Sequence, residues 1–133
     1  MVKKLLSKAF TLPELLLVAA ILGYAVSVVL LTFINSAALN EASRNLTAAT
    51  THAEFVMENI KNTTFPSIAT NISNGTWTWD TAAVTSHGLT ALNTESISTI
   101  STGTNPLDIT VTVAWNDTRG RSRSKILRTL ISG

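Results

Sequence analysis

The chain has 133 residues, 45% of them hydrophobic, no cysteine, two histidines and a formal net charge of +2. This length allows one small domain with an added segment, and the lack of cysteine excludes a fold held by disulfides. With no glycine-rich phosphate loop and no nucleophile motif, the sequence predicts no enzyme, no catalytic residue, no metal site and no cofactor.

Charge is segregated along the chain. Three of the ten basic residues lie in the first nine positions, and five more lie between residues 119 and 128. Between residues 10 and 118, only Arg44 and Lys61 oppose all eight carboxylates. The sequence therefore indicates a mildly acidic molecule with one basic hairpin near its C-terminus.

The first predicted element is a membrane-length helix. Residues 15–40 contain no charged side chain, and residues 15–34 are the most apolar part. At about 1.5 Å per residue, twenty helical residues span roughly 30 Å, the thickness of a bilayer core. A small protein cannot bury a helix that is apolar on all sides, so residues 15–34 are expected to lie in a membrane or in an assembly that imitates one.

Two simple interpretations of this N-terminus stay open. A basic start followed by an apolar run is typical of a secretory signal, and residues 36–38 offer small side chains for cleavage. A permanent anchor with its lysines in the cytoplasm also satisfies the positive-inside rule. Neither explains the carboxylate of Glu14 at the edge of the apolar run.

The stretch KAFTLPELL, residues 8–16, resembles the processing site of type IV prepilins and type II secretion pseudopilins. In that family, a prepilin peptidase removes a short basic leader on the cytoplasmic side, and the new N-terminal residue is then N-methylated. The resemblance implies that residues 1–9 are a leader, that cleavage falls between Ala9 and Phe10, and that Phe10 is methylated. The family usually has Gly before the cut, where this chain has Ala9.

The same resemblance gives Glu14 a role, because the family carries Glu at the fifth mature position. There it pairs with the N-terminal amine of a neighbouring subunit during assembly. A carboxylate in hydrocarbon is costly without a partner, and an α-amine with a pKa of about 8 supplies one. Glu14 is therefore the expected assembly charge, and Pro13 suits the first turn of the helix.

Beyond residue 34, apolar residues recur at spacings of three and four, as on one face of a helix. They are Leu39, Ala42, Leu46, Ala49, Ala53, Val56 and Ile60. Without an internal proline up to Lys61, this pattern predicts that the segment 10–62 forms one long helix of roughly 48 residues, or about 70 Å. The stripe is expected to pack against a sheet, a coiled-coil dimer being the alternative, and His52 is expected to bind no metal.

Residues 63–133 are predicted to form a β-rich head. The residue before Pro66 disfavours helix, residues 76–79 alternate like a short strand, and residues 82–104 are expected to be rich in loops. Residues 109, 111, 113 and 115 form an apolar strand face, followed by a turn at 116–121 and a return strand at 122–131. The head is too small for a secure core, so it should need residues 39–60 to fold.

The C-terminal sequence VTVAWNDTRGRSRSKILRTLIS, residues 111–132, resembles the last hairpin of PilV-type minor pilins. Both resemblances together imply an α+β, pilin-like fold and a structural subunit of a type IV pilus-like or type II secretion filament. The implied partners are the inner membrane, the prepilin peptidase, other subunits and the assembly machinery. The implied location is a single-pass inner-membrane protein with an extracytoplasmic head, then a pilus or pseudopilus at the cell surface or in the periplasm. The alternative is an N-terminally anchored extracytoplasmic binding domain, including a DNA-binding minor pilin in competence.

Four basic residues of this hairpin share one parity and would project from one face of an extended strand. They are Arg119, Arg121, Arg123 and Lys125. Such a group is able to bind nucleic-acid phosphates, to contact an acidic neighbouring subunit, or to protect a sheet edge from aggregation. All three interpretations stay open at the level of sequence.

Overall fold

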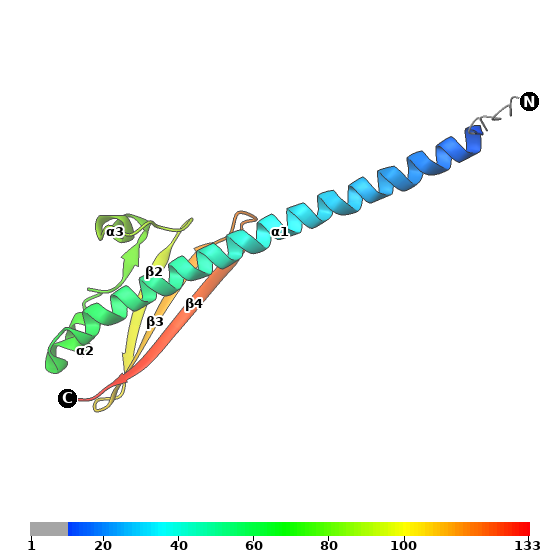
Figure 1. Ribbon diagram of the computed structural model, residues 1–133. Coiled ribbons are helices and arrows are strands. Elements are labelled where there is room, and N and C mark those ends of the chain that lie inside the picture. Colours follow the sequence, from blue (N-terminus) through cyan, green and yellow to red (C-terminus); the bar gives the residue numbers. More distant parts are fainter. Residues whose placement is uncertain (1–10) are drawn as a thin grey trace, which may run out of the picture. The chain divides into compact units, whose positions relative to one another are not determined.

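The computed structural model describes residues 11–133 (Figure 1). The predicted leader, the cleavage between Ala9 and Phe10, and the methylation of Phe10 lie outside the described residues. The chain divides into two units, which meet between Asn40 and Glu41 within one helix. Each unit is described separately below.

Helix α1 (Leu12–Lys61) is the long N-terminal helix that the sequence predicts. Pro13 and Glu14 lie in its first turn, where a missing N–H and a negative charge are both favourable. Lys61 lies in the last turn, where a positive charge complements the helix dipole.

In the first unit, every side chain from residue 15 to residue 34 is exposed. This part of α1 is long and apolar enough to cross a membrane. Its small hydroxyl groups are satisfied within the helix: Ser27 Oγ donates to the Gly23 carbonyl and Thr32 Oγ1 donates to the Val28 carbonyl, each at 2.9 Å. Among the described residues of the first unit, none is buried in a hydrophobic core.

The second unit, Glu41–Gly133, combines the remaining turns of α1 with a four-stranded antiparallel sheet. Its further elements are α2 (Phe65–Ser73), β1 (Trp79–Asp80), α3 (Thr81–Ser86), β2 (Ser96–Thr102), β3 (Leu107–Asn116) and β4 (Ser122–Ile131). The strands follow each other in the sheet in chain order, so β4 forms one edge. Together with α1, this gives the predicted α+β fold with a pilin-like layout.

The β3–β4 hairpin has the two predicted strands and the predicted apolar face of β3. Val113 pairs with Lys125, Val111 with Leu127, and Thr112 with Ile126. Residues of β3 alternate strictly between buried and half-buried, and Ile109, Val111, Val113 and Trp115 are on the buried face. The prediction of the hairpin, including its return strand at 122–131, is confirmed.

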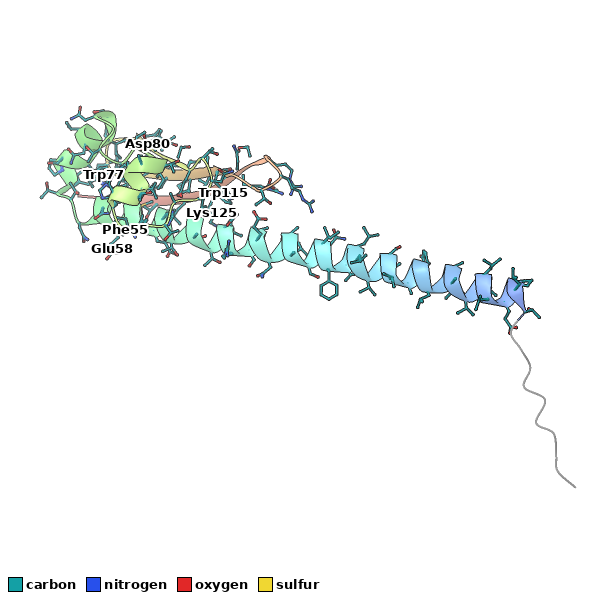
Figure 2. All side chains as sticks on the ribbon, turned by 90° about the horizontal axis from the view of Figure 1, so that it is seen from above. Phe55, Glu58, Trp77, Asp80, Trp115 and Lys125 are labelled. Atoms are coloured by element: carbon teal, nitrogen blue, oxygen red, sulfur yellow. The ribbon has the colours of Figure 1, made fainter. Side chains whose placement is uncertain are left out.

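The core of the second unit lies between this sheet face and α1, and Figure 2 shows Trp77, Trp115 and Phe55 around it. The predicted stripe is confirmed for Ala49, Ala53, Val56 and Ile60, which are fully buried. It is wrong for Leu39, Ala42 and Leu46, which are exposed. In this part of α1 the hairpin turn contacts Glu41, which lies beside the stripe. The sheet does not cover Ala42 and Leu46 of the stripe, and both stay exposed.

Two expectations for the middle of the head are wrong, namely the strand at residues 76–79 and the loop-rich segment at 82–104. Residues 74–77 form a turn around Gly75 (φ 74°), not a strand, and the Trp79 indole donates to the Thr76 carbonyl at 3.0 Å. Trp77 and Trp79 are both buried, and Trp79 belongs to the two-residue strand β1. Helix α1 ends at Lys61, next to its predicted end at residue 62, and Pro66 lies in the first turn of a second helix, α2, that was not predicted. The segment 82–104, expected to be rich in loops, contains most of α3 and all of β2.

Candidate functional site

The first predicted site residue, Glu14, lies in the first turn of α1 and is exposed. It makes no ion pair with any residue in the range 11–133. Its expected partner, the amine of Phe10 in a neighbouring copy, lies outside the described residues. The structure thus places a carboxylate without a charged neighbour at the start of the apolar helix segment.

The basic hairpin is organised by Asp117. Its Oδ1 accepts from the backbone N–H of Arg119 at 3.0 Å and of Arg121 at 2.9 Å. Its Oδ2 accepts from Arg121 Nε at 2.8 Å and lies 3.5 Å from Arg123 Nε. The backbone N–H of Arg121, followed by its guanidinium, lowers the pKa of Asp117 below its ordinary value.

The four predicted basic residues do not share one strand face. Arg119 and Arg121 lie in the turn, whereas Arg123 and Lys125 lie in β4 opposite Trp115 and Val113. Within the described residues, Arg119 and Lys125 make no ion pair, and Arg121 and Arg123 share one carboxylate. The hairpin turn therefore retains excess positive charge.

Further along β4, Arg128 pairs with Asp108 across the strands. Arg128 Nε donates to both carboxylate oxygens at 2.7 and 3.0 Å, and Nη2 contacts Oδ2. This hydrogen bonding lowers the pKa of Asp108 and raises the pKa of Arg128. The positive charge of Arg128 is therefore balanced by Asp108 in the neighbouring strand. By contrast, Arg119 and Lys125 make no ion pair in the range 11–133.

The hairpin tip is fixed to α1 by a contact that sequence reasoning did not find. Glu41 accepts from the backbone N–H of Thr118 at 3.2 Å and from its hydroxyl at 2.7 Å. Beside this contact is an open groove of about 560 Å³. It is lined by α1 from Glu41 to Ala48, by the loop 90–93, and by Asn116 and Thr118.

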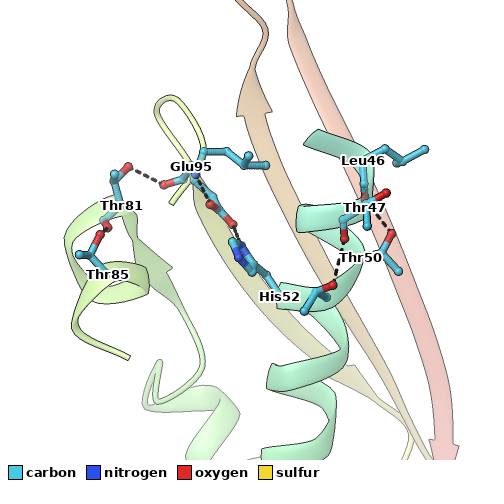
Figure 3. Close-up of polar contacts among 9 residues, drawn as sticks. Leu46, Thr47, Thr50, His52, Thr81, Thr85 and Glu95 are labelled. Atoms are coloured by element: carbon cyan, nitrogen blue, oxygen red, sulfur yellow. Dashed lines mark hydrogen bonds and ion pairs between the residues drawn. The ribbon is translucent and has the colours of Figure 1, made fainter. Parts of the chain in front are cut away.

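A buried polar pair supports the wall of this groove (Figure 3). His52 Nδ1 donates to Glu95 Oε1 at 2.7 Å, and Glu95 Oε2 accepts from the Leu92 N–H at 2.6 Å. Both residues are at most 4% exposed. Thr81 Oγ1 donates to the Glu95 carbonyl at 2.9 Å, so this residue joins α1, the 89–95 loop and α3.

The pair had no signal in the sequence, because His52 and Glu95 are 43 positions apart and neither belongs to a motif. A buried carboxylate needs several hydrogen bonds to be tolerated, and Glu95 has them from His52 and the loop. In the range 11–133, no three His, Asp or Glu side chains gather into a set able to hold a metal ion. The pair of His52 and Glu95, called the buried clamp below, therefore has a structural role: it holds α1, the 89–95 loop and α3 together.

Comparisons of the chain with protein-family models, with characterised proteins and with solved structures found no match. The functional argument therefore rests on the described residues: an apolar helix segment with Glu14 at its start, a basic hairpin, and a clamped head.

Proposed function

We propose that this protein is a minor pilin or pseudopilin, a structural subunit of a type IV pilus-like or type II secretion filament. The observation that carries the proposal is α1 itself. Its first part exposes apolar side chains on every side, with Glu14 in its first turn, and its last part supplies the core of the head. The first part of such a helix needs apolar surroundings. The last part is buried in the core of a folded head and cannot be removed without opening that core.

In the proposed mechanism, a prepilin peptidase cuts between Ala9 and Phe10 at the inner membrane. The new amine of Phe10 then offers a positive charge to Glu14 of an adjacent copy. Because a carboxylate gains most from a partner in an apolar environment, this pairing favours docking into a filament over remaining alone in lipid. The sheet and its loops stay outside the apolar layer, and the role is structural instead of catalytic.

The test is the intact mass of the full chain, expressed in a host with a prepilin peptidase and in one without it. With the peptidase, we expect a chain that starts at Phe10 and carries one added methyl group. A retained Met1 in both hosts would contradict the proposal and support a permanently anchored extracytoplasmic domain.

Two variants refine this test. Ala9→Gly restores the usual family residue and is expected to be cleaved at least as fast as the natural chain. Glu14→Gln keeps the size of the side chain but loses its charge, so it is expected to be cleaved and then to stay in the membrane fraction. Incorporation of Glu14→Gln into sheared filaments at the natural level would contradict the role given to this carboxylate.

A second candidate is a DNA-binding subunit, which the excess positive charge of the hairpin favours. Phosphate contacts weaken steeply with salt, so DNA retention should fall as salt rises. Changing Arg119, Arg121, Arg123 and Lys125 together to Gln should then abolish retention. Retention that is unaffected by these substitutions, or by salt, would exclude this candidate.

A further inference from the structure

The second unit carries two surfaces of opposite charge. Residues 107–133 hold five basic and two acidic side chains, whereas residues 41–106 hold five acidic and two basic ones. The two parts therefore have formal charges of +3 and −3, with the histidines neutral. Such a distribution lets one copy of the unit attract another without giving the unit a net charge.

The acidic surface is a ridge on α1 formed by Glu54 and Glu58, called the acidic ridge below. Both side chains are exposed and lie one helical turn apart, whereas Ala53, Val56 and Met57 between and beside them face the core. Neither glutamate forms an ion pair within the described residues. Like charges at this spacing destabilise a helix, and Lys61, three residues after Glu58, makes no ion pair with either glutamate in the range 11–133, so a cation that docks on the ridge would relieve their repulsion.

The basic surface, called the basic edge below, consists of Arg119 and Arg121 in the hairpin turn and of Arg123 and Lys125 in β4, the strand at the edge of the sheet. Apart from β3, no strand of the described chain pairs with β4. Asp117 is the only carboxylate that Arg121 and Arg123 contact there, and Lys125 has no ion-pair partner in the range 11–133. Figure 2 labels Lys125 on the hairpin and Glu58 on the helix, one residue from each surface.

The two surfaces also match in spacing. Residues four apart on a helix are separated by about 6 Å along its axis. Residues two apart on a strand, such as Arg123 and Lys125, are separated by about 6.6 Å and project from the same face. Two cations of the basic edge can therefore meet the two glutamates of the acidic ridge at once.

We propose that the basic edge of one copy docks on the acidic ridge of a second copy. The contact uses different surfaces on the two copies, so in copies that lie side by side in one orientation it can repeat from copy to copy, as a ring or as an open chain. This inference rests on the proposed function, because parallel apolar helices would hold the copies side by side in one orientation. A duplex is the less suitable occupant, since Asp117 places a carboxylate among the cations, where it repels phosphate.

The chain has no cysteine, so introduced cysteines report the contact without background. Thr51→Cys places a thiol beside the acidic ridge, and Ser124→Cys places one on β4 next to Arg123 and Lys125 in the chain but on the other face of this edge strand; both positions are exposed. The two full-length variants, with different tags, are expressed in one membrane and treated with a short bifunctional maleimide. We expect the mixed product to form in excess over either product that joins two chains of one variant.

Charge reversal provides the decisive step. Glu54→Lys with Glu58→Lys in the Thr51→Cys copy should lower the mixed product by about fivefold, as expected when surface ion pairs are replaced by repulsion. Arg123→Glu with Lys125→Glu in the Ser124→Cys copy should then restore it, and raised salt should weaken the natural pair. Rescue by a change in the other molecule cannot come from misfolding of either one.

Cross-linking that ignores the charge reversal, or that the reciprocal change fails to restore, would overturn the proposal. So would a product in which the ridge is joined to a different protein, or a basic edge whose reversal alters only oligonucleotide retention. The intact mass of the same chains separates the two proposals. Charge-dependent cross-links between chains that retain Met1 would uphold the contact and reject filament processing, whereas methylated Phe10 with charge-independent cross-links would do the reverse.

Discussion

The two parts of α1 have the same secondary structure and opposite surroundings. From residue 15 to residue 34 every side chain is exposed, whereas from Ala49 to Ile60 the helix buries six residues. Both parts are rich in apolar residues, but only the second alternates them with charged side chains. Side chains of α1 are therefore buried where apolar and charged residues alternate, and not where the helix has the most apolar residues.

The difference teaches that the two parts obtain their stability from different sources. An amphipathic segment can face a sheet and water at once, so its own chain completes its environment. A segment that is apolar all round has no polar side to leave in water, and by length and composition this one could cross a membrane. The predictions below test this division, beginning with the largest expected effect.

The head should not fold without the second part of α1. Ala49, Ala53, Val56, Met57 and Ile60 are part of its core, so a fragment of residues 63–133 lacks one wall of that core. We expect no cooperative thermal transition from this fragment, and a cooperative one from residues 41–133. Circular dichroism and proton NMR check this, and a sharp melt of 63–133 alone would show that the sheet is independent of the helix.

The buried clamp should be the most sensitive single position. His52→Ala leaves Glu95 buried without its ring partner, and breaking one side of a buried pair costs about 3–5 kcal/mol. The change is read from denaturant unfolding of the 41–133 fragment. His87→Ala is the matched control: this exposed ring stacks on Trp79 at 4.0 Å, and its loss should cost less than about 1 kcal/mol. Equal losses of unfolding free energy in His52→Ala and His87→Ala would contradict the stabilising role of the His52–Glu95 pair.

Within the stripe, burial should decide the effect of truncation. Ile60→Ala removes a fully buried side chain and should lower the free energy of unfolding by about 2–5 kcal/mol. Leu46→Ala, on the same stripe but 46% exposed, should change it by less than about 1 kcal/mol. The same denaturant titration measures both, and a large loss for Leu46→Ala would mean that the uncovered part of the stripe is packed after all.

Acid should weaken the hairpin slightly. Asp108 and Asp117 both have pKa values below 3.8 in the folded state, so the unfolded state binds protons first as the pH falls. The stability they contribute is complete above their ordinary pKa and is lost between about pH 5 and their folded values. Replacing both with Asn should flatten unfolding free energy against pH in this window. An unchanged slope would show that other carboxylates cause it.

How much of the fold could be predicted depends on how many residues each sequence pattern spans. Helix α1 and the β3–β4 hairpin have periodic patterns ten or more residues long, and a long pattern outweighs local exceptions. Elements α2, α3 and β1 have nine, six and two residues, too few to show a period. Residues 76–79 alternated like a strand, but Gly75 allowed a turn at residues 74–77, and both tryptophans are buried.

The sites divide in the same way. The parity of the four basic residues was visible, but Asp117 folds two of them into the turn, and parity applies only to extended chain. The contacts of Glu41 with Thr118 and of His52 with Glu95 join positions 77 and 43 residues apart. No local pattern records such contacts, because they arise only when the sheet docks on the helix.

The hydroxyl groups in the apolar part of α1 have one more consequence. Ser27 and Thr32 return their protons to carbonyls one turn back, so neither needs a hydrogen-bond partner from its surroundings. Lateral contacts along this stretch are therefore free to form by shape alone, and the helix can slide or rotate against a neighbour at little polar cost. In the filament proposed above, the register between neighbouring helices would then depend on Glu14, the charged side chain in the first turn of α1.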